Sequence, residues 1–303
     1  MVELVNNRRE FIKKSSLVGS GLMAGSAFFK EKSNKEELII LHTNDVHSHI
    51  HPFKNDHHRY PGNGGVIKRA LLIESYRKQY KNVLLLDAGD IFQGTPFFNF
   101  YGGELEMKLM TKMGYDAATL GNHDFDGGIN GLIKAKEFGE FDFINSNYIF
   151  ENELTSIVKP FKIIKKGKLK IGILGIGIEL EGLVDPKLCK GVIYTDPISN
   201  ANKTARLLKE KYHCDYVICL SHLGLKYDSD KVSDLLLAEK SKNIDLIIGG
   251  HTHSFLDEPI KTLNSEGEQT LVSQAAWAGL RLGIVKVSFT KGLKTSDGMT
   301  SKV

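Results

Sequence analysis

Eight side chains that could bind a metal ion or transfer a proton occur in five short segments of this sequence. They are Asp45, His47, Asp90, Asn122, His123, His222, His251 and His253. Imidazole nitrogens and carboxylate oxygens are ligands that proteins offer to zinc, manganese, iron and cobalt. No thiolate belongs to the set, and the sequence therefore predicts a centre for such divalent ions.

Three of the segments also have plainer interpretations when each is taken alone. Asp45 and His47 could reach one ion from the end of a strand, or they could belong to a solvated loop. Asp90 could bridge two ions after the flexible Gly89, or it could stabilise a turn. A lone His222 would usually be a core residue with satisfied hydrogen bonds. The combination favours a two-metal centre in which Asp90 is the shared ligand.

The other two segments carry more specific signals. His251 and His253 follow a pair of glycines and are two residues apart, which is a fair indication of metal ligands. Residues 121–126 include four polar side chains. Among them, Asn122 offers a neutral oxygen, and His123 could be a ligand or an acid–base group. A turn with an incidental histidine is the alternative for this segment.

Apolar runs precede these segments and predict the strands that would position them. They span residues 38–42, 83–86, 117–120, 216–220 and 246–248. Helical spacing alternates with them at 66–80, 105–113, 129–138, 197–212 and 231–240. This alternation predicts an α/β fold. Because ligands in open α/β sheets lie beyond the carboxyl ends of strands, we expect the five segments to converge on one place.

Five motifs, taken in order, resemble those of the calcineurin-like metallophosphoesterase superfamily. They are D-V-H at 45–47, G-D-I-F-Q-G at 89–94, G-N-H-D-F-D at 121–126, S-H-L-G at 221–224 and G-H-T-H at 250–253. The flanking stretches 41–45, 93–96, 114–117 and 274–277 are similar to the family of 5′-nucleotidases, UDP-sugar hydrolases and 2′,3′-cyclic phosphodiesterases. The resemblance covers about residues 38–290, a catalytic domain, and implies a four-layer α-β-β-α metallophosphoesterase sandwich.

The resemblance also implies a role for each candidate residue. One divalent ion (zinc, manganese, cobalt or iron) would be held by Asp45, His47, Asp90 and His253. A second would be held by Asp90, Asn122, His222 and His251. His123, paired with Asp126, would be a catalytic group that binds no metal. The implied chemistry is phosphoester hydrolysis in which a water is activated and the phosphoryl oxygens are held by the ions.

The function expected from these residues is that of an exported phosphoesterase acting on small phosphate esters, in particular nucleotides. The alternatives are a cyclic-nucleotide phosphodiesterase, a nucleotide-sugar pyrophosphohydrolase, a sulfur-ester hydrolase, or a metal-binding protein without catalysis. Relatives carry a C-terminal domain that stacks on the nucleoside base, but few residues follow Phe289. A further alternative is therefore a catalytic subunit that needs a separately encoded C-terminal substrate-binding domain.

The amino-terminal segment predicts export. Residues 1–30 combine Arg8-Arg9, a following Phe-Ile-Lys and a short apolar run with glycine and serine, which resembles a twin-arginine signal directing the protein to the periplasm or outside the cell. This run is too short for a stable membrane span. Residues 1–35 hold seven Lys or Arg and three Glu, and so account for the whole formal charge of +4. The neutral remainder argues against a nucleic-acid polymer as partner.

The remaining segments complete the predicted organisation. A linker is expected at 31–37, the catalytic domain at 38–290 and a polar tail at 291–303. The three cysteines favour small buried residues over a disulfide framework. His49, His51, His57 and His58 are expected at the surface or behind the ligands. The aromatic run at 92–101 is expected to pack in the core or a loop, with a substrate or partner surface as the alternative.

Overall fold

The computed structural model describes residues 35–290 and 293–303. The predicted export signal over residues 1–30, and residues 31–34 of the predicted linker, lie outside this range. Most of the described strands belong to two sheets. The first has the order β15 (Leu293–Lys302), β14 (Arg281–Thr290), β1 (Lys35–Thr43), β2 (Val83–Asp87), β3 (Ala117–Ala118), β4 (Asp142–Ile144) and β6 (Val158–Lys159). The second has the order β12 (Ile260–Leu263), β13 (Gln269–Ser273), β11 (Leu246–Ile248), β10 (Tyr216–Ser221), β8 (Leu169–Ile176) and β7 (Phe161–Lys166).

Strand β1 shows why the two sheets stack. Its alternate side chains point to opposite faces of the sheet. Leu38 and Ile40 belong to the apolar core between the sheets, where they share a cluster with residues of β8 and β10. Ile39 and Leu41 belong instead to the core between the first sheet and its helices. A strand buried on both faces reads as a continuous apolar run, which is the pattern that predicted it.

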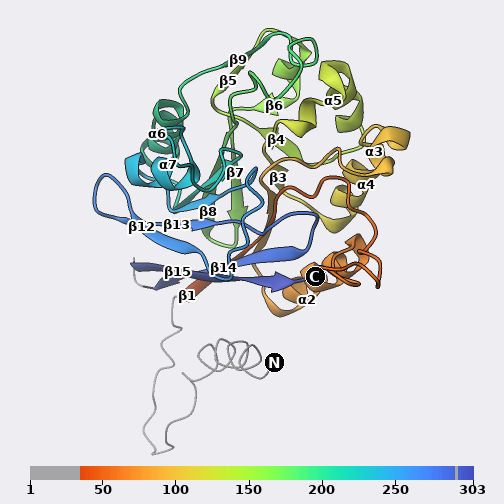
Figure 1. Cartoon of the computed structure of the whole chain (residues 1–303). Coiled ribbons are helices and arrows are strands. Elements are labelled where there is room, and N and C mark those ends of the chain that lie inside the picture. Colours follow the sequence, from red (N-terminus) through yellow and green to blue (C-terminus); the bar gives the residue numbers. More distant parts are fainter. Residues whose placement is uncertain (1–34, 291–292) are drawn as a thin grey trace, which may run out of the picture. The chain divides into compact units, whose positions relative to one another are not determined.

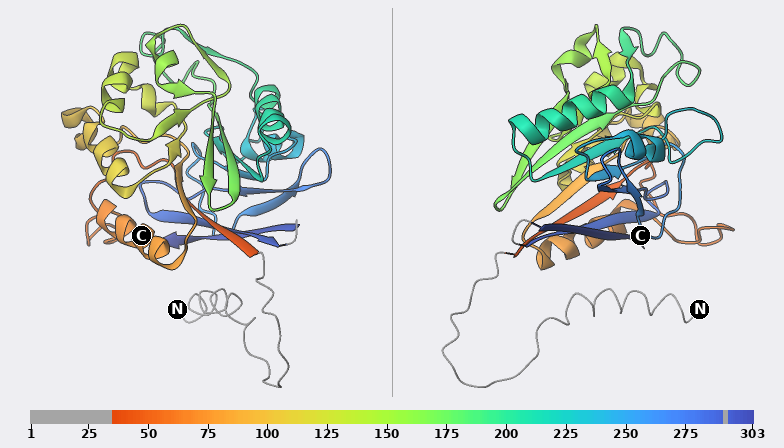
Figure 2. Two further views of the ribbon diagram at one scale, coloured as in Figure 1. Left: turned by 180° about the vertical axis from the view of Figure 1, so that it is seen from behind. Right: turned by 90° about the vertical axis from the view of Figure 1, so that its left-hand side faces the viewer.

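Helices cover the outer face of each sheet and complete the four layers. The first sheet is covered by α2 (Val66–Gln79), α4 (Glu104–Met113) and α5 (Gly128–Lys136), with the short α3 (Pro96–Tyr101) beside them. The second is covered by α6 (Pro197–Arg206) and α7 (Asp234–Lys240), which share a third apolar cluster with it. The two groups of helices lie on opposite flanks, both from the front and from behind (Figure 1, Figure 2). The α-β-β-α sandwich is confirmed.

Parallel pairing directs the strand ends of each sheet to one edge. β1, β2, β3 and β4 are parallel neighbours in the first sheet, and β8, β10, β11 and β13 are parallel neighbours in the second. Strands β5 (Tyr148–Phe150) and β9 (Val192–Tyr194) form a separate antiparallel ribbon. The loops that follow β1, β2, β3, β10 and β11 carry the candidate ligands.

Two predicted boundaries are corrected by strand pairing. Residues 35–37, expected in a linker, begin β1, because Lys35 pairs with Thr290 of β14. Residues 293–302, expected in a polar tail, form the edge strand β15. This strand pairs with β14 along its length, from Leu293 opposite Thr290 to Lys302 opposite Arg281. This strand is largely polar because it lies at the edge of the sheet. Its Met299 is partly buried and packs against the apolar core. Its few apolar residues left no strand signal in the sequence.

The described residues include no helix that is both long and apolar enough to cross a membrane. Cys214 and Cys219 are buried and free, and Cys189 is partly buried and free.

Candidate metal centre and acid–base pair

Two groups of ligand side chains meet at the edge where the strands of the two sheets end. The first group contains Asp45, His47 and His253, and the second contains Asp90, His222 and His251. In each group, ligand atoms from all three residues lie within 4.8 Å of one another. Each group combines residues from both sheets, so the centre is completed only when the sheets stack.

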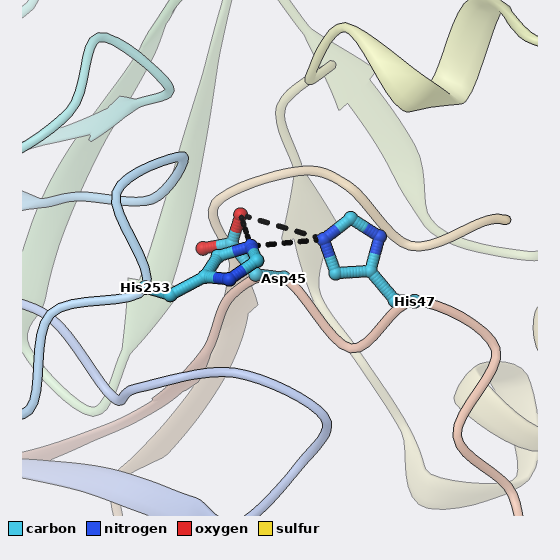
Figure 3. Close-up of side chains that lie close together, drawn as sticks. All are labelled: Asp45, His47 and His253. Carbon is cyan, nitrogen blue, oxygen red and sulfur yellow. Dashed lines mark hydrogen bonds and ion pairs between the residues drawn. The ribbon is translucent and has the colours of Figure 1, made fainter. Parts of the chain in front are cut away.

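The first group is a tight triangle of one carboxylate and two imidazoles (Figure 3). The Nε2 atoms of His47 and His253 are 3.1 Å apart. Asp45 Oδ1 lies 3.9 Å from His47 Nε2 and 3.5 Å from His253 Nε2. Asp45 is fully buried, whereas the His253 side chain is 39% exposed, so the group is open to solvent on the His253 side.

The second group lies directly beside the first. Asp90 Oδ2 is 3.1 Å from His222 Nε2 and also 3.7 Å from His47 Nε2 of the first group. The side-chain oxygen of Asn122 is 2.9 Å from Nδ1 of His251. The structure therefore brings together all seven residues expected as ligands, with Asp90 between the two groups.

Hydrogen bonds leave lone pairs of two imidazoles available for a metal ion. His222 Nδ1 lies 2.7 Å from the carbonyl oxygen of Ala88, and His47 Nδ1 lies 3.3 Å from that of Phe92. A carbonyl only accepts, so both Nδ1 atoms are donors and Nε2 carries the lone pair in the neutral rings. Nε2 of His222 is buried and makes no well-aligned hydrogen bond among the described residues, and it lies 3.1 Å from Asp90 Oδ2 and 3.9 Å from Asp45 Oδ1. A buried nitrogen between two carboxylates fits a bound cation.

The electrostatics of the second group also favour added positive charge. Burial disfavours the charged form of His222, but Asp90 and Asp45 outweigh this effect and raise its pKa to about 10. Burial likewise opposes charge on Asp90, yet His222 and His47 lower its pKa. The carboxylates thus attract a cation into a buried site, which is the role of metal-binding carboxylates.

His123 and Asp126 form a separate, partly exposed pair beside His47. His123 begins a short 3₁₀ turn, His123–Phe125, and its Nδ1 is 2.8 Å from Asp126 Oδ2. The hydrogen bond to Asp126 raises the pKa of His123 above its usual value. The His123 and His47 rings are 5.3 Å apart at 73°, so the pair adjoins the first group without belonging to it.

Most of the ligand residues have strained backbone. Positive φ angles occur at Asp45 (50°), His47 (50°), Asp90 (55°), His251 (71°) and His253 (52°). Such conformations are uncommon for residues with a side chain and persist where the surroundings fix them. The clustering of strain at these positions is typical of a functional site.

Three supporting residues were not assigned a role from the sequence. The buried carboxylate of Asp124 accepts the N–H groups of Asp90 (3.0 Å), Ile91 (2.9 Å) and Gly121 (2.8 Å), so it joins the loops after β2 and β3. The sequence signal that could have indicated this role is the position of Asp124 within the 121–126 motif.

The other two supporting residues are Asn44, which binds the loop 274–279, and Trp277, which belongs to that loop. The Asn44 side chain accepts a hydrogen bond from the N–H of Ala275 (2.7 Å) and donates one to the carbonyl oxygen of Ala276 (2.7 Å). Trp277 then stacks on the His253 ring, with centroids 5.5 Å apart and planes at 6°. No local pattern in the sequence indicates this stacking, because the two residues come from different loops.

The four additional histidines, His49, His51, His57 and His58, belong to neither metal-binding group. The rings of His49 and His57 each contact Phe53, at 5.1 and 4.7 Å between centroids. His49 is partly buried, and burial with the nearby His47 lowers its pKa to about 4, so this ring is neutral.

Comparisons with known proteins agree with this geometry. The model of the calcineurin-like phosphoesterase family matches residues 38–255. The chain is 34% identical to a snake venom 5′-nucleotidase of Naja atra over 275 residues, which cover 84% of this chain and 50% of that protein. It is 30% identical to the trifunctional nucleotide phosphoesterase protein YfkN of Bacillus subtilis, over 95% of this chain and 21% of that protein.

Solved structures give the same result. A 5′-nucleotidase precursor from Thermus thermophilus superposes with a TM-score of 0.80 at 30% identity, covering 88% of this chain and 55% of that one. The NAD nucleotidase of Haemophilus influenzae superposes with a TM-score of 0.73 at 28% identity, covering 89% and 55%. The chain spans about half the length of such relatives. The stretch matched by the family model, residues 38–255, includes every candidate metal ligand.

Proposed function

We propose that this chain, which belongs to the calcineurin-like phosphoesterase family of metal-dependent phosphoric ester hydrolases, cleaves phosphate esters of nucleotides at the two-metal centre. The observation that carries the proposal is the adjacency of two ligand groups through Asp90, 3.1 Å from His222 and 3.7 Å from His47. The pair His123 and Asp126 lies beside them and is partly exposed, so a substrate could reach it.

The ligand assignment is part of the proposal. Asp45, His47, Asp90 and His253 would hold one divalent ion, and Asp90, Asn122, His222 and His251 would hold the other. Ions bound there would supply an activated water and positive charge opposite the phosphoryl oxygens. Asp90 could serve both ions, because its Oδ2 is 3.1 Å from His222 Nε2 of one group and 3.7 Å from His47 Nε2 of the other.

His123 would donate a proton to the leaving oxygen. Its Nδ1 is held by Asp126, so Nε2 is the nitrogen free to face a substrate. The raised pKa of His123 keeps it protonated nearer to neutral pH, as a general acid requires. Asp126 positions the ring and stabilises its charged form.

Nucleotides are the proposed substrate class because the similar proteins named above are nucleotidases or nucleotide phosphoesterases. Cyclic nucleotides and nucleotide sugars are the alternatives within the same chemistry. A substrate screen over these three classes, with added manganese, cobalt or zinc, tests the proposal. Hydrolysis of a nucleotide that stops with a chelator supports it, and metal-loaded protein that cleaves no phosphate ester refutes it.

Export through a twin-arginine route is proposed from Arg8-Arg9, the following Phe-Ile-Lys and the short apolar run with glycine and serine. Replacing both by lysine should retain the protein in the cytoplasm, and unchanged secretion of the variant would reject this route. A separately encoded substrate-binding domain remains a second proposal. Copurification of such a chain would support it, and full nucleotide turnover by this chain alone would contradict it.

A further inference from the structure

An aromatic recess lies beside the candidate metal centre. It has a volume of about 280 Å³ and is lined by the loop 49–57 and by the beginning of α3. We define the aromatic recess by His49, His51, Phe53 and His57 of the loop and by Thr95 and Phe97 of the other wall. Its volume is close to the lower end of the roughly 300–1,000 Å³ range of small-molecule pockets, which suits one flat ring system.

Ring contacts connect the aromatic recess to a proposed metal ligand. Trp277, stacked on His253, meets the His49 ring edge-on at 5.5 Å and the Phe53 ring at 6.0 Å. Trp277 therefore lies between the recess and His253, a proposed ligand whose side chain is 39% exposed. A group joined to a phosphate at the metal centre could reach the recess.

The walls of the aromatic recess are preformed. The loop is closed by backbone hydrogen bonds from Phe53 to Asn63 (2.9 Å) and from Val66 to Ile50 (2.9 Å). The hydroxyl of Thr95 ties the other wall to the carbonyl of Ser48 at 2.7 Å. A preformed site loses less entropy on binding than one that must be ordered.

Polar groups at the aromatic recess suit a ring with a hydrogen-bonding edge. His57 Nδ1 accepts the N–H groups of Tyr60 (2.9 Å) and Arg59 (3.3 Å), so in the neutral ring Nε2 is a donor. Lys54, which also lines the recess, has no ion pair among the residues that the structure describes. Aromatic faces with a few donors recognise nucleobases by stacking and by hydrogen bonds to ring edges.

We propose that the aromatic recess binds the flat heteroaromatic part of the ester's leaving group, a nucleobase, while its phosphate occupies the metal centre. This inference rests on the proposed function and adds a substrate-selecting site within the catalytic domain itself. Phe53 and Phe97 would supply the stacking surface, and His57 and Lys54 would face the ring edge.

Trp277 provides a direct binding assay, because it is the single tryptophan of the chain and touches the recess. Adenosine, which has no phosphate to cleave, should change its fluorescence in a saturable way. Phe97→Ala, which removes one wall of the recess, should weaken adenosine about tenfold, the scale expected for one lost stacking contact. Phe53→Leu, which keeps apolar bulk, should weaken it as well. Phe100→Ala is the matched control, since Phe100 lies on the same helix but is 82% exposed and does not line the recess.

A kinetic comparison separates this inference from the proposed function. In the wild type, kcat/KM should be higher for AMP than for ribose 5-phosphate, and Phe97→Ala should reduce that ratio about tenfold. Unaltered adenosine affinity and selectivity in Phe97→Ala and Phe53→Leu, both folded by circular dichroism, would overturn the recess proposal. Saturable adenosine binding with no hydrolysis of either ester would support the recess and reject the proposed function.

Discussion

Asp45 illustrates how single residues are held in conformations that they would otherwise avoid. Its backbone has φ 50°, its carbonyl accepts the N–H of Ala278 at 2.7 Å, and its carboxylate accepts the N–H of His251 at 2.9 and 3.0 Å. Each such strained residue costs of order 1–3 kcal/mol. The hydrogen bonds offset that cost and fix the carboxylate where a ligand is needed.

His123 is the residue whose removal should separate catalysis from metal binding. Replacing it by alanine removes the proposed general acid but none of the proposed ligands. We expect kcat to fall by roughly 10²–10⁴, while the metal content, measured by elemental analysis, stays at the wild-type level. Loss of bound metal in His123→Ala would show that His123 is a ligand instead. Asp126→Asn should give a smaller loss of kcat by the same assay.

At the scale of elements, β1 and β14 leave room for a buried imidazole between the sheets. His42 of β1 is fully buried, and its Cα partner across the pair is Gly283 of β14. A Cβ at Gly283 would overlap the His42 ring. The ring also reaches the other sheet, since its Nε2 lies 2.9 Å from Ser273 Oγ of β13.

Gly283→Ala should therefore destabilise the protein, by about 1–3 kcal/mol as for other overpacked cores. The free energy of unfolding can be measured by urea denaturation. Gly131→Ala is the matched control, because Gly131 lies inside helix α5 and a Cβ there meets nothing within 4 Å. That variant should be neutral or more stable by roughly 0.5–1 kcal/mol. Equal stabilities of the two variants would contradict this account of β1 and β14.

His42 should also make stability depend on pH. Burial lowers its pKa to about 3 from 6.5, so the folded protein keeps it neutral while the unfolded chain protonates it below pH 6.5. Its contribution is fully present above pH 6.5 and is lost as pH falls toward 3. Between pH 7 and pH 5 this loss is about 2 kcal/mol.

The test compares the wild type with His42→Asn by urea denaturation of chelated protein at both pH values. The wild type should lose more stability than the variant by about that amount. If the wild type and His42→Asn lost the same free energy of unfolding between the two pH values, His42 would not be held neutral in the folded protein.

At the scale of the whole molecule, metal binding at the proposed centre should raise the free energy of unfolding. The candidate ligands come from both sheets, so an ion bound there would stabilise only the stacked, folded state. Metal at 100 times its dissociation constant should add about 2.7 kcal/mol per site. Thermal melting of chelated protein should therefore shift upward when manganese or zinc is added.

Asp90→Asn should suppress most of this shift, because Asp90 lies between both ligand groups. Asp230→Asn, a change to an exposed carboxylate, serves as the control and should keep the full shift. An equal shift in Asp90→Asn and the wild type would mean that the ions bind elsewhere.

Much of the fold could be predicted because its strands are buried on both faces. β1, β2, β10 and β11 gave continuous apolar runs, and helices such as α2 gave helical spacing. The edge strand β15 could not be predicted, since a strand with one open face and few apolar residues resembles a tail. The short β3 was overestimated by two residues, because the Cα pairing with β2 ends at Ala118. Thr119 still donates its N–H to the carbonyl oxygen of Asp87 at 3.0 Å, and both Thr119 and Leu120 are buried like strand residues.

The residues that could form the metal centre were recognisable in the sequence, because their chemical types and their places after apolar strands are local properties. How they meet depends on tertiary packing. The stacking of the two sheets places His222 and His253 beside Asp90 and Asp45, and the folding of separate loops places Trp277 against His253 and Phe53. Contacts between residues more than 100 positions apart depend on packing, which no local pattern encodes.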